Sequence, residues 1–427
     1  MRALLHPLIA AAWLLGAPAP AAASAPRQPL VDDEQLVGRV LNLADERLAL
    51  MPAVAAAKWP RHLPVSDPAR EAVVTHSAGE HARQVGLKPA PVEQLLVLQI
   101  RLAKSVEERL FARWDATGDD FPGKSPDLTQ ELRPQLDRLA DASIAALYLA
   151  APAFGRPDFV PWAKELARQR LPAARWSEAD RDELVAALAE VRWVSAASVS
   201  RSRAAGVLRI GTPGDYAPFS TSVDGAVTGA DIELAEALGD SLGLRTVFVR
   251  SSWRTLLADL AADRFDVAVG GISVTPARSA VADFSPPTTR SGKTAIGRCT
   301  DAARLGRFEA INVPTVSVVF NPGGTNETFA RAHLKFARLV EHDDNRTVFD
   351  EILGGRADVM FTDETEIALA THQHPQLCRL LQESFEPADK AFLMPRASGW
   401  TDVVNPWMDR ALHDGVPARL LREYLDR

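Results

Sequence analysis

Apolar residues recur with the period of an α-helix through the first half of the chain. Alanine, leucine, glutamate and arginine dominate from about residue 30 to residue 194, and prolines separate the periodic stretches. A further helix should begin at Asp67-Pro68, because these residues read as an N-cap followed by a first-turn proline. Pro52 is expected to kink the first helix. The pattern predicts no strand in this half and helices over 36–57, 92–114, 128–149 and 179–194.

Beyond residue 206 the pattern changes to alternating strands and helices. Short apolar runs at 207–210, 246–250 and 266–269 alternate with helical patterns at 232–242 and 253–262. This alternation predicts an α/β domain with a largely parallel sheet. We therefore expect a multidomain protein: an all-α domain over 26–197, a polar linker or fraying helix end over 198–206, and an α/β domain over 207–427.

The composition is that of a folded, soluble protein of two or three domains. The chain has 427 residues, of which 47% are hydrophobic and 24% charged. A net charge of -7 and the lack of a basic run argue against a nucleic-acid partner. The sequence leaves the oligomeric state open, a homo-oligomer included.

The first 25 residues read as a cleaved signal peptide. Arg2 precedes a short apolar stretch at 4–17, and small residues at 17–25 offer cleavage sites between Ala23 and Ala25. The mature protein should then be periplasmic or secreted, with no membrane contact; a retained N-terminal anchor is the alternative. In an oxidising compartment the two cysteines, Cys299 and Cys378, should form a disulfide, and two buried thiols are the alternative.

One segment of the α/β half combines an anion-binding turn with an acid. Asn-Pro-Gly-Gly-Thr-Asn-Glu at 321–327 follows a strand-like run at 315–320. Adjacent glycines allow close approach of the backbone to a ligand, and the free N–H groups of a turn that leads into a helix attract an anion. Glu327 adds a carboxyl group that could move a proton. The segment therefore points to chemistry on a carboxylate substrate.

Several cationic residues of the helical half are placed where their side chains could converge. Arg47 and Lys58 are eleven residues apart, about three helical turns, so both should point the same way. Arg70 and Arg133 each lie early in a later helix, and Glu107 lies on the helix over 92–114. The cations together would form a pocket for a small dianion, although each cation alone reads more simply as a solvated charge on a helix.

Residues 30–195 resemble the exported, all-helical chorismate mutases. The resemblance implies that Arg47 and Arg133 hold the substrate carboxylates, that Lys58 faces the ether oxygen and a carboxylate, and that Arg70 and Glu71 shape the rest of the site. Glu107 would hydrogen-bond the breaking ether bond, which requires a neutral carboxyl group and a raised pKa. Three residues depart from the pattern, namely Pro52, Val74 and Ala103. The motifs are Glu46-Arg-Leu-Ala-Leu-Met51, Val54-Ala-Ala-Ala-Lys-Trp59, Asp67-Pro-Ala-Arg-Glu71, Gln99-Ile-Arg-Leu-Ala-Lys104 and Leu132-Arg-Pro-Gln-Leu-Asp137.

Residues 206–425 resemble periplasmic amino-acid-binding proteins and, among them, cyclohexadienyl dehydratase. The resemblance implies two lobes, about 207–295 with 394–427 and about 296–393, joined by hinges near 294–299 and 391–395. Both cysteines would then belong to the second lobe. The motifs are Gly270-Gly-Ile-Ser-Val-Thr-Pro-Ala-Arg-Ser279, Ser291-Gly-Lys-Thr294, the 321–327 turn, Ala357-Asp-Val-Met-Phe-Thr-Asp-Glu364, His374-Pro-Gln-Leu-Cys378 and Lys390-Ala-Phe-Leu-Met-Pro-Arg396.

The same resemblance implies a role for each site residue. Glu327 would be the general acid, and Arg278 would bind one carboxylate through two parallel bonds. Lys293 and the N–H groups around Gly324, Thr325 and Asn326 would stabilise charge. Asp363 stands where binding proteins recognise an amino group, which leaves arogenate open as a second substrate. Tyr216, Phe219 and Trp253 would wall the ring, with core packing as the alternative for each.

The sequence thus predicts an exported enzyme with two activities and no cofactor or metal. The helical domain would convert chorismate to prephenate, and the α/β domain would convert prephenate to phenylpyruvate. His372 and His374 read as surface histidines, because no Cys or His cluster supports a metal site. Two alternatives stay open: a solute-binding α/β domain without catalysis, and a degenerate mutase that serves as a scaffold.

Overall fold

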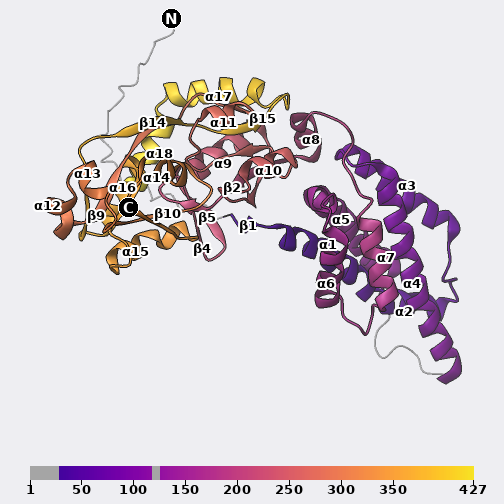
Figure 1. Cartoon of the computed structure of the whole chain (residues 1–427). Helices are drawn as coiled ribbons and strands as arrows, with labels where there is room; N and C mark the ends of the chain where they lie inside the picture. The colour runs from indigo at the N-terminus through magenta and orange to yellow at the C-terminus, as the bar shows by residue number, and fades with distance from the viewer. Residues whose placement is uncertain (1–27, 118–125) are drawn as a thin grey trace, which may run out of the picture.

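The computed structural model describes residues 28–117 and 126–427 and contains an all-helical part followed by an α/β part (Figure 1). The expected signal peptide lies outside the described residues. The expected fold class, an all-α domain joined to a two-lobed α/β domain, is confirmed. The helices of the first part are α1 (Asp33–Ala49), α2 (Met51–Lys58), α3 (Pro68–Gln84), α4 (Pro89–Thr117), α5 (Arg133–Phe154), α6 (Phe159–Arg170) and α7 (Glu178–Leu188), with single turns η1 (Trp59–Arg61) and η2 (Leu128–Leu132).

Two predicted helices differ from the structure at their ends. The stretch at 36–57 is two helices, because Pro52 lies in the first turn of α2 and the chain breaks at Leu50. The last predicted helix ends at Leu188 rather than at residue 194. Trp193 instead forms an antiparallel bridge with Leu87, so tertiary contact overrides the helical pattern there.

The segment expected to be a polar linker is a docked helix, α8 (Ser198–Ala205). Its residues Ser198, Arg201 and Ser202 are buried, although they read as polar and exposed in the sequence. The Ser198 hydroxyl donates to the carboxylate of Asp266 and accepts a hydrogen bond of 3.0 Å from the indole of Trp400. The bonds of Ser198 therefore hold α8 against the first lobe.

The first lobe of the α/β part is built on a six-stranded sheet with the order β1-β6-β2-β7-β15-β8. Strands β1, β6, β2 and β7 are parallel, and β15 is antiparallel to both of its neighbours. A small three-stranded sheet, β3-β4-β5, lies beside it. The strands are β1 (Leu30–Val31), β2 (Val207–Thr212), β3 (Asp215–Tyr216), β4 (Ser220–Val223), β5 (Ala226–Thr228), β6 (Arg245–Arg250), β7 (Val267–Ala268), β8 (Ala282–Phe284) and β15 (Leu393–Pro395), and the helices are α9 (Ala230–Leu242), α10 (Leu256–Ala261), α11 (Pro276–Ser279), α17 (Thr401–His413) and α18 (Val416–Leu425).

Strand β1 corrects the expectation that residues 30–194 contain no strand. Leu30 pairs with Phe248 and Val31 with Val249, so these two residues lie on the edge of the first lobe before the chain enters the helical domain. Two residues are too few to show a period in the sequence, and the strand exists only because β6 offers a free edge. Figure 1 shows β1 and α8 as two separate links between the helical and α/β parts.

An ion pair and a cation–π contact join the helical domain to the first lobe. Asp33 at the start of α1 accepts from Arg264 of the first lobe at 2.6 Å and from Arg156 at 2.8 Å. Arg209 on β2 is fully buried, pairs with Asp266 at 2.7 Å, and stacks 4.3 Å from the ring centre of Trp193 in the helical domain. Removing either partner of such a pair leaves a buried charge, so the junction resists separation.

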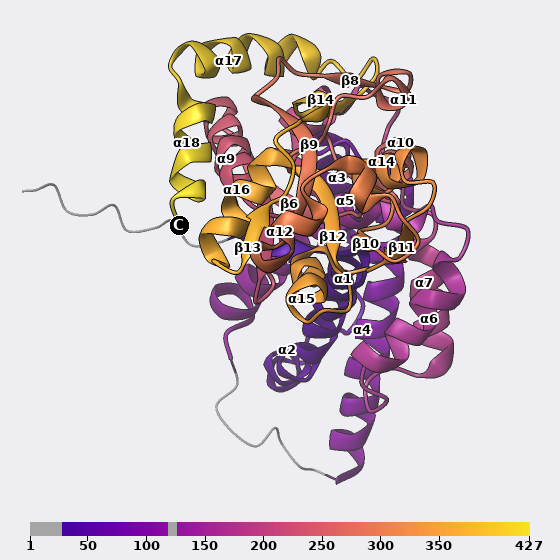
Figure 2. The same cartoon turned by 60° about the vertical axis from the view of Figure 1, so that its left-hand side comes forward.

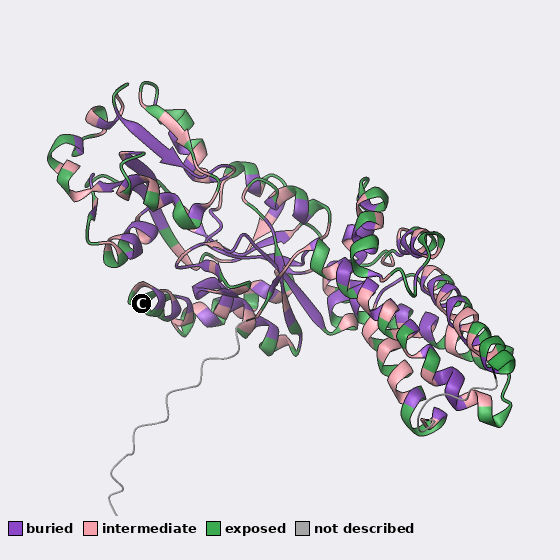
Figure 3. Ribbon diagram, turned by 90° about the horizontal axis from the view of Figure 1, so that it is seen from below, coloured by how far each residue is buried: buried purple, intermediate pink, exposed green. Residues whose placement is uncertain are grey.

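The second lobe is built on a sheet with the order β11-β10-β12-β9-β13, with β14 also paired to β9 (Figure 2). In both lobes the central strands are buried while the surrounding helices expose their outer faces (Figure 3), and β11 and β14 of the second lobe are partly exposed. The strands are β9 (Thr289–Arg298), β10 (Ser317–Phe320), β11 (Arg338–Glu341), β12 (Val359–Asp363), β13 (Leu377–Arg379) and β14 (Phe385–Lys390), and the helices are α12 (Ala302–Leu305), α13 (Phe308–Ile311), α14 (Thr325–His333), α15 (Val348–Leu353) and α16 (Glu364–Gln373), with single turns η3 (Cys299–Asp301) and η4 (Asn345–Thr347).

The chain crosses between the lobes earlier than expected. The first crossing lies at 285–288, between β8 and β9, and not at 294–299. Strand β9 is continuous over its ten residues, and its partners β12, β13 and β14 all belong to the second lobe. The second crossing, at 391–392, lies inside the expected hinge. A hinge inside β9 would break a sheet ladder, whereas the loop before it can absorb the motion.

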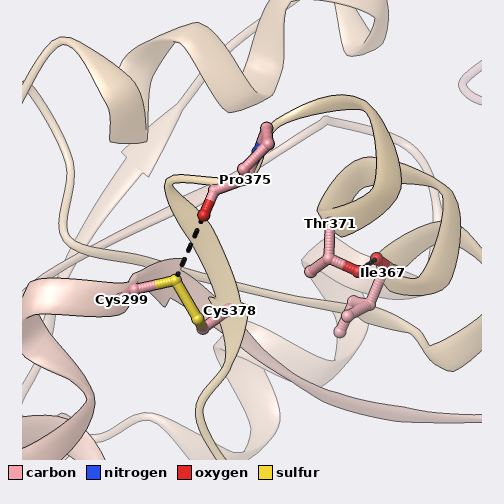
Figure 4. The surroundings of a disulfide bond; sticks show 5 residues. All are labelled: Cys299, Ile367, Thr371, Pro375 and Cys378. Carbon is pink, nitrogen blue, oxygen red and sulfur yellow. Dashed lines mark hydrogen bonds between the residues drawn. A yellow bond between two sulfur atoms is a disulfide. The ribbon is translucent and has the colours of Figure 1, made fainter.

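The predicted disulfide is confirmed, with Cys299 bonded to Cys378 in the second lobe (Figure 4). The bond joins the end of β9 to β13 across 79 residues of sequence. Closing a loop of that length restricts the unfolded chain and stabilises the lobe by about 4.5 kcal/mol in the chain-entropy model.

We predict that replacing both cysteines by serine lowers the unfolding temperature of the second lobe and leaves the helical domain folded. Differential scanning calorimetry of the double variant and of the wild-type protein with a thiol reductant should show the same loss. If the double variant unfolds at the wild-type temperature, the bond contributes nothing to the stability of the lobe.

Across residues 28–117 and 126–427, no helix combines the length and the apolar character needed to cross a membrane.

Candidate active sites

The helical domain contains a cavity that brings together all six of its predicted site residues. Helices α1 to α5 with η2 surround it, so residues far apart in sequence share one wall. The break at Leu50 does not separate Arg47 on α1 from Lys58 on α2. Those that line the cavity are Arg47, Lys58, Arg70, Glu71, Glu107 and Arg133, together with Val74 and Ala103.

A buried ion pair forms the polar centre of this cavity. Lys58 Nζ lies 2.7 Å from Glu107 Oε2, and it also donates to the Val65 carbonyl at 3.1 Å. Burial raises the pKa of Glu107, and the opposing charge of Lys58 only partly offsets that effect. Burial also lowers the pKa of the Arg47 guanidinium, against the pull of Asp137. The site therefore holds cations poorly compensated by the protein, which suits an anionic ligand.

Glu71 closes one side of the cavity through local bonds. Its Oε1 accepts from the Ser66 hydroxyl and from the Asp67 N–H, both at 3.1 Å. Its Oε2 lies 3.3 Å from Lys104 Nζ.

Lys104 and Asp137 also line the cavity, and the sequence analysis did not identify them as site residues. The signal was present, because Lys104 lies three residues before Glu107 and Asp137 four residues after Arg133 on the same helix faces.

A second cavity lies between the two lobes of the α/β part. Tyr216, Trp253, Gly271, Ser273 and Arg278 come from the first lobe. The second lobe, including β14, supplies the remaining lining residues. Its volume is about 20 Å³, room for about one water molecule, so the lobes must part to admit a substrate. The second-lobe residues that line it are Asn321, Gly324, Thr325, Asn326, Asp363 and Lys390.

Seven of the ten predicted residues of the α/β site line this cavity. Lys293 lies just behind the wall and donates to the side-chain oxygen of Asn326. Trp253 is fixed by a 2.9 Å bond from its indole to Asp215, and Tyr216 meets it edge to face. Phe219 stacks behind Tyr216 and is core rather than lining. The seven are Tyr216, Trp253, Arg278, Gly324, Thr325, Asn326 and Asp363.

Arg278 is a buried cation without a carboxylate partner among the described residues. Its Nη1 donates to the Ser273 carbonyl at 2.9 Å, and its guanidinium lies 5.9 Å from the Trp253 ring centre. Burial lowers the pKa of Arg278 to about 10. An unpaired buried guanidinium is costly, so the position favours an incoming carboxylate.

Glu327 does not line the cavity, contrary to the expectation that it faces a substrate. Its Oε2 accepts from the Gly323 N–H at 2.7 Å, and its Oε1 accepts from Arg331 Nε at 2.7 Å. The Gly323 N–H, followed by Arg331, lowers the pKa of Glu327. The physical reason is its place in the first turn of α14, where unpaired N–H groups favour a charged carboxylate. In this arrangement Glu327 is ionised at neutral pH.

Comparison with known protein families decides what these two parts are. The family model for bacterial extracellular solute-binding proteins, family 3, matches residues 208–427, and the model for chorismate mutase type II matches residues 38–108. The chain belongs to family 3 of the bacterial extracellular solute-binding proteins. Its N-terminal part is a chorismate mutase type II domain fused to that module.

Curated relatives cover both parts. Cyclohexadienyl dehydratase of Pseudomonas aeruginosa is 41% identical over 252 residues, 57% of this chain and 94% of the relative. A monofunctional chorismate mutase of Enterobacter agglomerans is 32% identical over 159 residues, 36% of this chain and 83% of the relative. The solute-binding domain is therefore cyclohexadienyl dehydratase-like.

The second part of the chain shares its fold with solved structures. An amino acid ABC transporter substrate-binding protein from Streptococcus pneumoniae, bound to L-arginine, covers 54% of this chain and 98% of its own length with a TM-score of 0.51. At 24% identity this likeness concerns the fold alone.

Proposed function

We propose that this protein is an exported enzyme with two activities that act in sequence. The mutase domain converts chorismate to prephenate, and the solute-binding domain converts prephenate to phenylpyruvate. One observation carries the proposal: each domain gathers cations around a cavity. The similarity of the two parts to a chorismate mutase and to a cyclohexadienyl dehydratase supports it.

The first reaction suits the helical cavity. The rearrangement of chorismate is unimolecular and needs no nucleophile, so the protein has to hold the reactive conformer and stabilise charge on the ether oxygen. Arg47 and Arg133 would hold the two carboxylates. Lys58 and a neutral Glu107 would donate hydrogen bonds to the ether oxygen.

The second reaction suits the cavity between the lobes. A proton transferred to the ring hydroxyl lets it leave as water, while the ring carboxylate departs as carbon dioxide and its bonding electrons complete the aromatic ring. Arg278 would hold the pyruvyl carboxylate, and Glu327 is the proposed acid. A bound dianion would raise the pKa of Glu327, because like charge disfavours the carboxylate form.

The test is chorismate incubated with the purified mature chain, with products followed over time. Phenylpyruvate supports both activities. Prephenate that accumulates supports the mutase alone. Unchanged chorismate together with conversion of added prephenate refutes the mutase and retains the dehydratase. The full chain is needed, because a cut near residue 200 would divide α8 and expose the buried junction.

A second candidate function is a solute-binding module beside a degenerate mutase scaffold. The ionised state of Glu327 favours it, because a charged carboxylate cannot donate a proton. Failure to release carbon dioxide from prephenate, with tight binding of a carboxylate ligand, would establish it.

The same family membership supports export to the periplasm or beyond the cell, since its members are extracellular solute-binding proteins. Determining the N-terminal residue of the mature protein from a periplasmic extract would test this.

Glu107→Gln is predicted to extend mutase activity to higher pH. The neutral carboxyl donates, so wild-type kcat/KM should fall as pH rises through the raised pKa of Glu107, whereas the amide donates at every pH. The measurement is kcat/KM from about pH 4 to about pH 9. Glu190→Gln, at an exposed glutamate of the same domain, is the matched control and should keep the wild-type profile; a wild-type profile for Glu107→Gln would contradict the neutral-carboxyl role.

A further inference from the structure

An exposed strap forms part of the outer wall of the cavity in the helical domain. This strap, made of residues 62–67, connects η1 to α3, and all of its residues except Val65 are exposed. The apolar clusters of the described residues contain no residue of the strap, so its position depends on polar contacts. The strap residues that line the cavity are Leu63, Pro64, Val65 and Asp67.

The strap contacts Lys58 through a backbone carbonyl. Lys58 Nζ donates to the Val65 carbonyl at 3.1 Å and lies 2.7 Å from Glu107 Oε2. An ammonium has three N–H groups, so these two contacts leave one for the ether oxygen of a substrate. Because the lysine side chain is long and flexible, the two acceptors decide where that third N–H points.

Lys104 fastens the strap to α4, the helix that carries Glu107. Lys104 Nζ donates to Ser66 Oγ at 3.0 Å and to Glu71 Oε2 at 3.3 Å, and the Ser66 hydroxyl donates to Glu71 Oε1 at 3.1 Å. Burial raises the pKa of Glu71, but its hydrogen bonds, led by that from the Asp67 N–H, outweigh burial and lower it. An ionised carboxylate only accepts, so the Ser66 hydroxyl donates to Glu71 and keeps its lone pairs for Lys104.

These contacts form one closed path around the edge of the cavity. Lys104 and Glu107 lie three residues apart on α4, on the same face of the helix. Ser66 is not among the described residues that line the cavity, so it acts on a ligand only through its neighbours. The path runs, in order, through Lys104, Ser66, Val65, Lys58 and Glu107.

We propose that Lys104 is a positioning residue for the mutase reaction, because it fixes the strap and, through the Val65 carbonyl, the ammonium of Lys58. Stabilising the charge that develops on the ether oxygen requires a donor with a fixed position. A misplacement of about 1 Å can lower a rate about a hundredfold. Two groups of the protein already engage Lys104, so its role needs no contact with the substrate. The inference rests on the proposed mutase function and deepens it.

The test measures kcat and KM for chorismate with the purified full chain. Ser66→Ala and Lys104→Met should each lower kcat about tenfold or more at nearly unchanged KM, because the lost contact fixes a group that stabilises the transition state. The double variant should lose no more than either single variant, because both remove the same contact. Ser195→Ala and Lys88→Met, at exposed residues of the same part of the chain, are the matched controls and should keep the wild-type kcat.

Conservative variants separate positioning from a loss of stability. Lys104→Arg keeps a cationic donor and Ser66→Thr keeps a hydroxyl, so both should retain most of the wild-type kcat. Ser66 is exposed, so Ser66→Ala should keep the wild-type unfolding temperature in calorimetry while it lowers kcat.

The outcomes distinguish this inference from the proposed function. Wild-type kcat in Ser66→Ala, or losses that add in the double variant, would overturn the inference. A raised KM at unchanged kcat in Lys104→Met would also overturn it, because Lys104 would then bind the substrate directly. In each of these cases the wild type converts chorismate and the proposed mutase stands. No conversion of chorismate by the wild type would instead refute the proposed mutase.

Discussion

Glu327→Gln is expected to lower the dehydration of prephenate by about two to four orders of magnitude, which is the usual contribution of a general acid. The amide keeps the size and the acceptor oxygen of the side chain, so α14 and its contact with the Gly323 N–H should persist. Prephenate binding should be retained, because Arg278, Lys293 and Lys390 are unchanged. The measurement is carbon dioxide release alongside the dissociation constant for prephenate, with exposed Glu383→Gln as the matched control.

The pH dependence of the wild type sharpens this test. The Gly323 N–H and Arg331 lower the pKa of Glu327, so the protonated fraction of the free enzyme falls as pH rises through the acidic range. If Glu327 is the acid, kcat/KM should fall together with the protonated fraction of Glu327. The rate of the reaction without protein is measured at each pH for comparison. Full activity in Glu327→Gln would remove Glu327 from the mechanism and transfer the role of acid to a lysine ammonium, with Lys390 as the candidate among the described lining residues.

The mutase site was more predictable from sequence than the site between the lobes, and the reason is physical. Arg47, Lys58 and Glu107 lie on helices, where a fixed angle per residue converts spacing into a shared face. The break at Leu50 altered the helix but not the convergence of its side chains. Resemblance to a known family supplied the roles that spacing alone could not.

The features that could not be predicted from the sequence depend on contacts between segments that are far apart in the chain. Lys390 meets Asp363 only because β12 and β14 flank the same strand, β9, and no local pattern encodes that register. Glu327 was correctly placed at the start of a helix, but the direction of its side chain depends on Gly323 and Arg331. Strand β1 and helix α8 likewise arise from contacts with partners more than fifty residues away.

Gly323→Ala is expected to prevent the lobes from closing and to lower kcat/KM for prephenate by about a hundredfold or more, since a misplacement of about 1 Å can cost that much. Gly323 belongs to the second lobe, and a Cβ there would lie 2.5 Å from the backbone nitrogen of Arg254 on the first lobe. Backbone atoms cannot move aside as a flexible side chain can, so the lobes would have to stay apart. Nearby contacts between the lobes would be lost too, including the Arg254–Glu341 ion pair and the 2.9 Å bond from Asn345 to the Asp215 carbonyl.

A second glycine separates blocked closure from backbone strain. Gly323 has φ of +82°, so alanine is strained there whatever the space around it. Gly355 in the same lobe has φ of +72°, and a Cβ there would meet nothing within 4 Å. Gly355→Ala should therefore share the strain, by about 1 kcal/mol of stability, but keep the wild-type kcat/KM. Small-angle scattering with and without prephenate would report closure directly. Equal loss of activity in both variants would attribute the effect to strain, whereas loss in Gly323→Ala alone, with mutase activity intact in both, would tie dehydration to closure of the lobes.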